Sequence, residues 1–269
     1  GPDSVFLFYP SESSEFLSQF ALSIIIFTGG FQTPFSRIKS VVGEGLVLAN
    51  FGVLVTAILV GVFASFITPL SLLEGMLLGA IISSTDAAAT YSILETRKLK
   101  LKYNTGRALE MESATNDPMA MILTLVFCMM LGNSETGGFF KYAIYFGQQL
   151  LVGGLSALMM GLILKQIFKR MSFREENLKP IFLLAILLVT TLGADILGGN
   201  ILVAAFILGL MLGNTDFKYK KTSRSFFSTL SWLAQATMFV ILGLQIFPNA
   251  LMEAFGYAWL PALFLFFMA

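Results

Sequence analysis

Two short polar clusters in an otherwise apolar chain hold the residues whose types could do chemistry. The first cluster contains Ser83, Ser84, Thr85 and Asp86, and the second contains Glu112, Ser113, Asn116, Asp117 and Pro118. Hydroxyl, amide and carboxylate oxygens are ligands for a hard cation, and a carboxylate can hold a proton instead of a cation. The chain has no histidine, so proton chemistry near neutral pH would have to use carboxylates.

The first cluster predicts an interrupted helix. Short polar side chains compete with the helical hydrogen bonds of the backbone, and an unwound stretch would free carbonyl oxygens as further ligands. In the second cluster, Pro118 cannot donate a hydrogen bond, so a backbone carbonyl near Ala114 is also expected to be available as a cation ligand. Two other interpretations stay open. Asn116-Asp117-Pro118 is also typical of a helix start, and Ser-Ser-Thr can simply pack one membrane helix against another.

The elements that must position these clusters are membrane-spanning helices. The chain of 269 residues is 56% hydrophobic and 12% charged, whereas soluble proteins carry roughly 25% charged residues. Backbone polar groups must be satisfied internally in lipid, so we predict an all-α polytopic membrane protein with about nine transmembrane helices. The predicted spans are 16–34, 41–67, 73–95, 107–131, 140–166, 180–197, 200–214, 226–247 and 251–269.

The basic residues support this count and indicate depth. Every Lys and Arg except Lys141 lies on alternate loops, which the positive-inside rule makes cytoplasmic. Asp117 follows Arg107 by ten residues, which is about 15 Å along a helix and half of the hydrocarbon thickness. Asp86 lies thirteen residues into the span that begins at Leu73, so both clusters are expected near the midplane.

Composition also excludes several classes of function. A net charge of +1 argues against a nucleic-acid partner, and Cys128 as the one cysteine excludes a disulfide framework. We expect no cofactor.

A cation channel would need a filter loop, and none is recognisable. An intramembrane protease with a carboxylate dyad is conceivable if Asp86 and Asp117 share a proton. Glu44 and Glu110 are expected to be interfacial.

The two clusters also give the chain a family resemblance. Thr85-Asp86-Ala87-Ala88-Ala89, followed by Glu112-Ser113-x-x-Asn116-Asp117-Pro118, resembles the NhaP-type monovalent cation/proton antiporters, in particular their potassium/proton branch. The resemblance covers the whole chain and implies exchange of K⁺ or Na⁺ for protons by alternating access, not an enzymatic reaction. It also implies an inverted-repeat fold of about thirteen helices with a broken helix at the midplane, of which this chain would be an internal fragment.

The resemblance assigns expected roles to individual residues. The implied ion- and proton-binding residues are Asp117, Asn116, Thr85, Asp86 and Ser113. Asp117 is expected to hold a cation or a proton alternately, with Asn116 as its neighbouring partner. Thr85 is expected to offer its backbone carbonyl, and Ser113 is expected to be a further ligand. Asp86 is expected to offset the charge of the helix ends.

The resemblance also implies an organisation for the chain. Residues 1–269 would be part of one exchanger domain, with ion-carrying core helices at 41–131. Scaffold helices at 180–247 would form a homodimer, and 251–269 would begin the second half of the core. Glu112 is expected to form a structural ion pair with an arginine of a later core helix. The implied location is the plasma membrane, the inner membrane of a bacterium, crossed several times.

Overall fold

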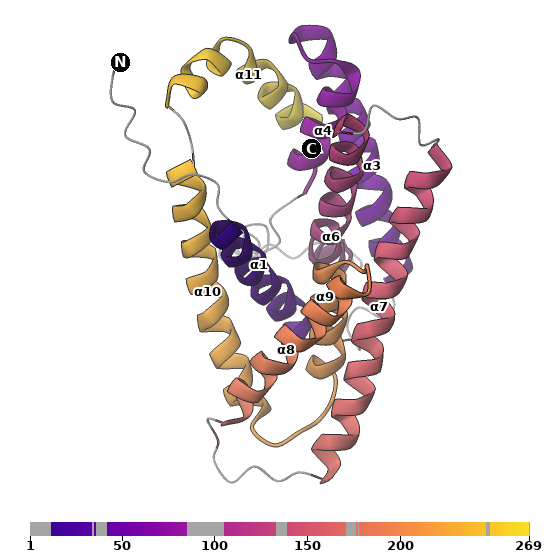
Figure 1. Cartoon of the computed structure of the whole chain (residues 1–269), viewed down its shortest axis with the longest axis vertical. Coiled ribbons are helices and arrows are strands. Elements are labelled where there is room, and N and C mark those ends of the chain that lie inside the picture. The colour runs from indigo at the N-terminus through magenta and orange to yellow at the C-terminus, as the bar shows by residue number, and fades with distance from the viewer. Residues whose placement is uncertain are drawn as a thin grey trace. The chain divides into compact units, whose positions relative to one another are not determined.

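The chain is helical throughout the part that its computed structural model describes, which is residues 12–33, 35, 42–84, 105–132, 139–170, 176, 178–245 and 248–268. Nine helices lie within these residues, with no strand among them (Figure 1). They are α1 (Glu12–Gln32), α3 (Val42–Ile67), α4 (Leu72–Ile82), α6 (Thr105–Gly132), α7 (Phe139–Arg170), α8 (Leu178–Ile196), α9 (Ile201–Gly213), α10 (Lys220–Gln245) and α11 (Pro248–Met268). The prediction of an all-helical fold is therefore confirmed.

The nine helices fall on the nine predicted spans, with two informative differences. Helix α10 begins at Lys220, six residues before the predicted start. Its first turns are polar, so the apolar run that predicts the span begins later than the helix. Helix α4 ends at Ile82, and the predicted span continues into residues 85–95, which lie outside the described part. By length and apolar composition, five of the described helices could cross a membrane: α1, α3, α7, α8 and α10.

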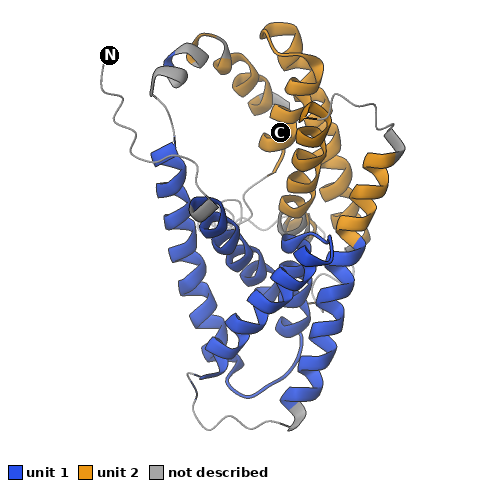
Figure 2. Ribbon diagram, in the orientation of Figure 1, with its two compact units in different colours: residues 1–34, 151–253 blue, residues 35–150, 254–269 orange. Residues whose placement is uncertain are grey.

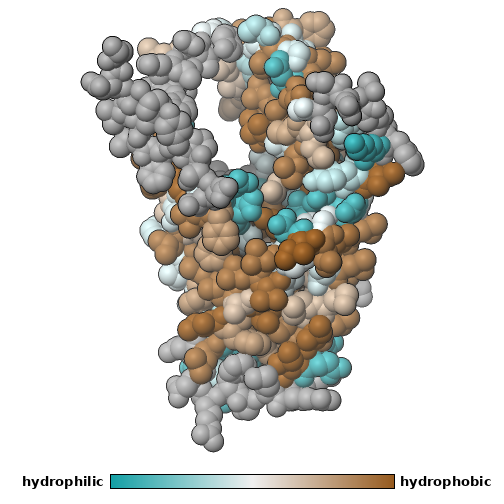
Figure 3. All heavy atoms as spheres, viewed as in Figure 1, coloured by the Kyte–Doolittle hydropathy of each residue, from teal (hydrophilic) through white to brown (hydrophobic). Residues whose placement is uncertain are grey.

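The surface of these helices is apolar over long stretches. Figure 3 shows hydrophobic residues covering much of the described surface in this view. Large side chains are widely exposed, among them Phe66, Trp232 and Phe239 at 83%, 72% and 72% of their surface. A water-soluble protein rarely exposes so much contiguous apolar surface, so lipid is the expected solvent of these faces.

Contacts within the chain divide it into two compact units (Figure 2). Unit 1 comprises residues 1–34 and 151–253, and unit 2 comprises residues 35–150 and 254–269. Unit 1 thus holds α1, α8, α9 and α10, unit 2 holds α3, α4 and α6, and both α7 and α11 contribute to each unit.

Unit 1 is built around the short helix α9, which is apolar on all sides and almost entirely buried. The side-chain oxygen of Asn200 caps its first turn by accepting from the backbone N–H groups of Leu202 and Val203, at 2.9 and 3.1 Å. Helix α1 packs against α9 and α10. The Phe27 ring lies 4.7 Å from the Phe227 ring of α10, so aromatic side chains fill this interface.

Glycines allow α1 and α9 to approach at backbone distance. A Cβ atom on Gly30 would collide with the carbonyl oxygen of Phe206 and lie 2.9 Å from the backbone nitrogen of Leu210. A Cβ atom on Gly209 would collide in the same way with the carbonyl oxygen of Phe27. Small residues at these positions let membrane helices pack closely, which is their main source of association in lipid.

Gly30→Ala is therefore expected to destabilise unit 1, by about 1–3 kcal/mol, because the added methyl group meets rigid backbone. Gly29→Ala is the matched control, since a Cβ atom there meets nothing within 4 Å. Alanine favours a helix over glycine by about 1 kcal/mol, so the control should be neutral or slightly stabilising. Thermal unfolding in detergent measures both variants, and equal melting temperatures would contradict the close approach of α1 and α9.

Candidate functional site

Helix α4 carries the first polar cluster at its carboxyl end. The helix begins with a capping box, in which Ser71 accepts from the backbone N–H of Glu74 and the Glu74 carboxylate accepts from the backbone N–H of Ser71. It ends at Ile82 with Ser83 as its C-cap. Eleven residues span about 16 Å, so a helix that starts at one membrane face ends near mid-depth.

Close packing holds α4 against α3. A Cβ atom on Gly79 would collide with the carbonyl oxygen of Ala57 and lie 3.0 Å from the Cα of Ala57. One turn earlier, a Cβ atom on Gly75 would collide with the carbonyl oxygen of Gly61. The backbones of α3 and α4 are thus in direct contact over two turns, which leaves α4 little freedom to slide or rotate.

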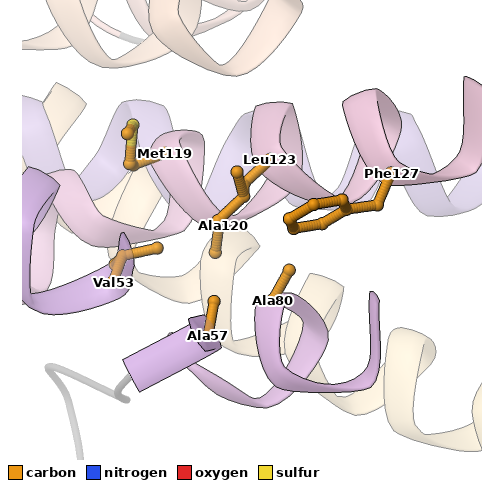
Figure 4. Packing of buried hydrophobic residues seen from close by; sticks show 7 residues of the cluster. All are labelled: Val53, Ala57, Ala80, Met119, Ala120, Leu123 and Phe127. Carbon is orange, nitrogen blue, oxygen red and sulfur yellow. The ribbon is translucent and has the colours of Figure 1, made fainter. Parts of the chain in front are cut away.

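Helix α6 packs on the same pair of helices through a buried apolar cluster (Figure 4). The cluster consists of Val53, Ala57, Ala80, Met119, Ala120, Leu123 and Phe127. Met119 and Ala120 directly follow the second polar cluster, and Ala80 lies three residues before Ser83. The packing of these apolar residues therefore brings Ser83 and Ser84, the described part of the first cluster, to the level of the second cluster.

The second polar cluster lies inside α6, not at its start. The helix runs without interruption from Thr105 to Gly132 and includes Pro118. The open interpretation of Asn116-Asp117-Pro118 as a helix start is therefore wrong, because several helical turns precede the proline. Pro118 still has no N–H to donate, so it removes one bond from the helical ladder.

Among the described residues, a hydrogen bond between Ser84 and Asp117 joins the two clusters. The Ser84 hydroxyl donates a hydrogen bond to the Oδ1 carboxylate oxygen of Asp117. Both side chains are half-buried. Ser84 lies just beyond the carboxyl end of α4, where the helix dipole places partial negative charge. This environment, together with the carboxylate, favours a bound cation.

Asn116 and Glu112 form the second described pair of the site. The Nδ2 atom of Asn116 donates to Oε1 of Glu112 at 3.2 Å, as their spacing of four residues in a helix allows. Asn116 is completely buried, with 0% of its surface exposed. The buried amide therefore fixes the orientation of the Glu112 carboxylate, one helical turn earlier on α6.

The structure places Asp117 against Ser84 and pairs Asn116 with Glu112, and the three predicted site residues Asp117, Asn116 and Glu112 all lie on α6. Thr85 and Asp86 lie outside the described residues, as does the side chain of Ser113, although the Ser113 backbone is helical. Glu44 is exposed in the first turn of α3, as expected for an interfacial residue.

Ser84 is the residue of this site that sequence reasoning does not single out. The sequence places it in a polar cluster and predicts a disturbed backbone there, not a side-chain contact. The sequence signal that could single out Ser84 is its position two residues before Asp86, which is expected near mid-depth. Which of several neighbouring hydroxyls faces the carboxylate depends on where α4 ends and how α4 is rotated.

Comparison with known proteins gives matches along the whole chain. The model of the family described as "Sodium/hydrogen exchanger, transmembrane" matches residues 1–269. The K⁺/H⁺ antiporter NhaP2 of Shewanella oneidensis is 35% identical over 99% of this chain and 45% of its own length. The K⁺/H⁺ antiporter NhaP of Alkalimonas amylolytica is 31% identical over 88% of this chain and 41% of its own length. The chain therefore spans less than half the length of these curated relatives.

A solved structure shows the same fold. The sodium proton antiporter MjNhaP1 of Methanocaldococcus jannaschii, at pH 8, superposes with a TM-score of 0.82. Its sequence is 26% identical, and the match covers 95% of this chain and 65% of that protein. The resemblance to NhaP-type antiporters and the predicted fold class are both confirmed. This chain, a multi-pass membrane protein by its apolar helices, belongs to the sodium/hydrogen exchanger family.

Proposed function

We propose that the full-length protein exchanges a monovalent cation, K⁺ or Na⁺, for protons across the plasma membrane by alternating access. The family match supports this proposal, and so do the names of the relatives, which are K⁺/H⁺ and Na⁺/H⁺ antiporters. It is a transport function and not an enzymatic reaction. The family assignment supports neither the intramembrane protease nor the cation channel.

Asp117 is the residue that we propose couples the two ions. One carboxylate binds either a cation or a proton, so each ion leaves the site when the other enters. The observation that carries this proposal is the contact of Asp117 with Ser84, just beyond the carboxyl end of α4. A carboxylate at that point meets both a hydroxyl oxygen and the negative end of the α4 dipole, which together favour a cation.

The remaining predicted residues take supporting roles in this proposal. Asn116 and Glu112 are hydrogen-bonded to each other on α6, which favours a structural role for the pair. Glu112 would in addition pair with an arginine of a later core helix. Thr85 and Ser113 would contribute oxygen ligands, and Asp86 would offset the charge of the helix ends.

The division of labour between core and scaffold is also proposed. Unit 2 holds all of the predicted core helices within 41–131 together with residues 254–269, and unit 1 holds the predicted scaffold helices within 180–247. This independent division by contacts supports a moving core and a separate scaffold. The scaffold would form the homodimer, and the lipid bilayer would cover the exposed apolar faces.

The experiment that tests the function uses the full-length protein in vesicles with a trapped pH-sensitive dye. Addition of K⁺ or Na⁺ outside should drive protons out of the vesicles, and vesicles without protein provide the background. Proton movement with one or both cations supports exchange. Cation uptake without any proton movement, or no response to either cation, would show that the proposed function is wrong.

A further inference from the structure

We propose that the side-chain oxygen of Ser84 is a direct ligand of the transported cation, beside the carboxylate of Asp117. This inference rests on the proposed function, because it assumes that a cation binds at Asp117. It adds a side-chain ligand from the end of α4 to the site.

The first argument is geometric. The Ser84 hydroxyl and the Asp117 carboxylate come from different segments of the chain and meet in a hydrogen bond. A cation that binds the carboxylate from the side of α4 therefore lies within reach of the serine oxygen. Both residues are half-buried, so the two oxygens are neither sealed in the packed core nor fully hydrated.

The second argument is chemical. A serine hydroxyl has one proton and two lone pairs, and a carboxylate has about four lone-pair directions. The hydroxyl can therefore donate to the carboxylate and still offer a lone pair to a cation. A cation in lipid must replace its water shell with protein oxygens, and a hydroxyl already held beside the carboxylate needs little reorganisation to serve as one.

The neighbouring serine provides a natural contrast. The Ser83 hydroxyl donates to the carbonyl oxygen of Ala80 at 2.8 Å, and 6% of the Ser83 surface is exposed. Its hydroxyl is therefore occupied in closing the end of α4. Two adjacent serines of equal size thus differ in what their hydroxyl groups contact, and this makes Ser83 a matched control for Ser84.

The test measures exchange by the full-length protein in vesicles, with the apparent KM and the maximal rate determined separately for K⁺ and Na⁺. Ser84→Ala should raise the KM for the transported cation about tenfold, as expected for losing one bond to a charged group. The maximal rate should stay within about twofold of the wild type, because the remaining ligands still release the cation. Ser84→Thr keeps the hydroxyl and should restore the KM, and Ser83→Ala should leave it unchanged.

Ser84→Cys provides a second variant should Ser84→Ala fail to fold. Sulfur is a poor ligand for a hard cation although cysteine resembles serine in shape, so the KM should again rise. A wild-type KM in Ser84→Ala or Ser84→Cys would overturn the assignment, as would an equal rise in Ser83→Ala. Asp117→Asn in the same assay separates the two proposals. If it is inactive while Ser84→Ala is normal, only the role of Ser84 fails. If Asp117→Asn exchanges normally, the coupling role of Asp117 fails, and the proposed function itself fails only if the wild-type protein does not exchange.

Discussion

Replacement of Asp117 by asparagine should abolish cation-driven proton movement in the full-length protein, down to the level of protein-free vesicles. Asparagine keeps the shape of the side chain and can still accept the hydrogen bond from Ser84. It has no negative charge for the cation and no site for the proton. Packing around α6 should therefore survive, while both halves of the exchange are lost.

The control for this variant is Asp195→Asn. Asp195 lies near the end of α8 in unit 1 and is exposed, so its carboxylate is hydrated and should not take part in exchange. Asp195→Asn should keep the wild-type rate. Size-exclusion chromatography and thermal unfolding check that both variants are folded. A folded Asp117→Asn variant that exchanges K⁺ or Na⁺ for protons at the wild-type rate would refute the mechanism.

Gly79→Ala should have the second-largest effect, because one added methyl group is placed between the backbones of α3 and α4. The nearest atoms belong to the backbone of Ala57, so no flexible side chain can move aside. We expect a loss of about 1–3 kcal/mol of stability from overpacking. We also expect slower exchange, because α4 must shift away from α3 and carries Ser84 with it, which disturbs the contact of Ser84 with Asp117.

Gly52→Ala is the matched control on α3, where a Cβ atom meets nothing within 4 Å. It should match the wild type in both melting temperature and exchange rate, or melt slightly higher because alanine favours the helix. Exchange by Gly79→Ala at the wild-type rate, with an unchanged melting temperature, would contradict the backbone contact between α3 and α4. A lower melting temperature with normal exchange would show that the site tolerates a displaced α4.

The sequence alone determined the class of the protein and located the nine helices that lie among the described residues, and it predicts the depth of the polar clusters. These properties depend on composition and on distance along one chain, and a helix converts residue count into depth at about 1.5 Å per residue. Asp117 and Asn116 could be singled out because polar groups inside an apolar span are costly and therefore rare. The characteristic order of these residues was also sufficient to recognise the family.

Only the tertiary structure decided how the helices fit together and what the polar side chains contact. The Asn116-Asp117-Pro118 motif is compatible with both a helix start and a helix interior. In the structure it lies inside α6, where the next residues, Met119 and Ala120, pack against α3 and α4. Ser84 contacts Asp117 while Ser83 contacts Ala80, although the two serines are neighbours of the same type. The direction of a side chain depends on where a helix ends and how it is rotated. Helix α4 ends at the Ser83 cap, and its glycine contacts with α3 restrict its rotation.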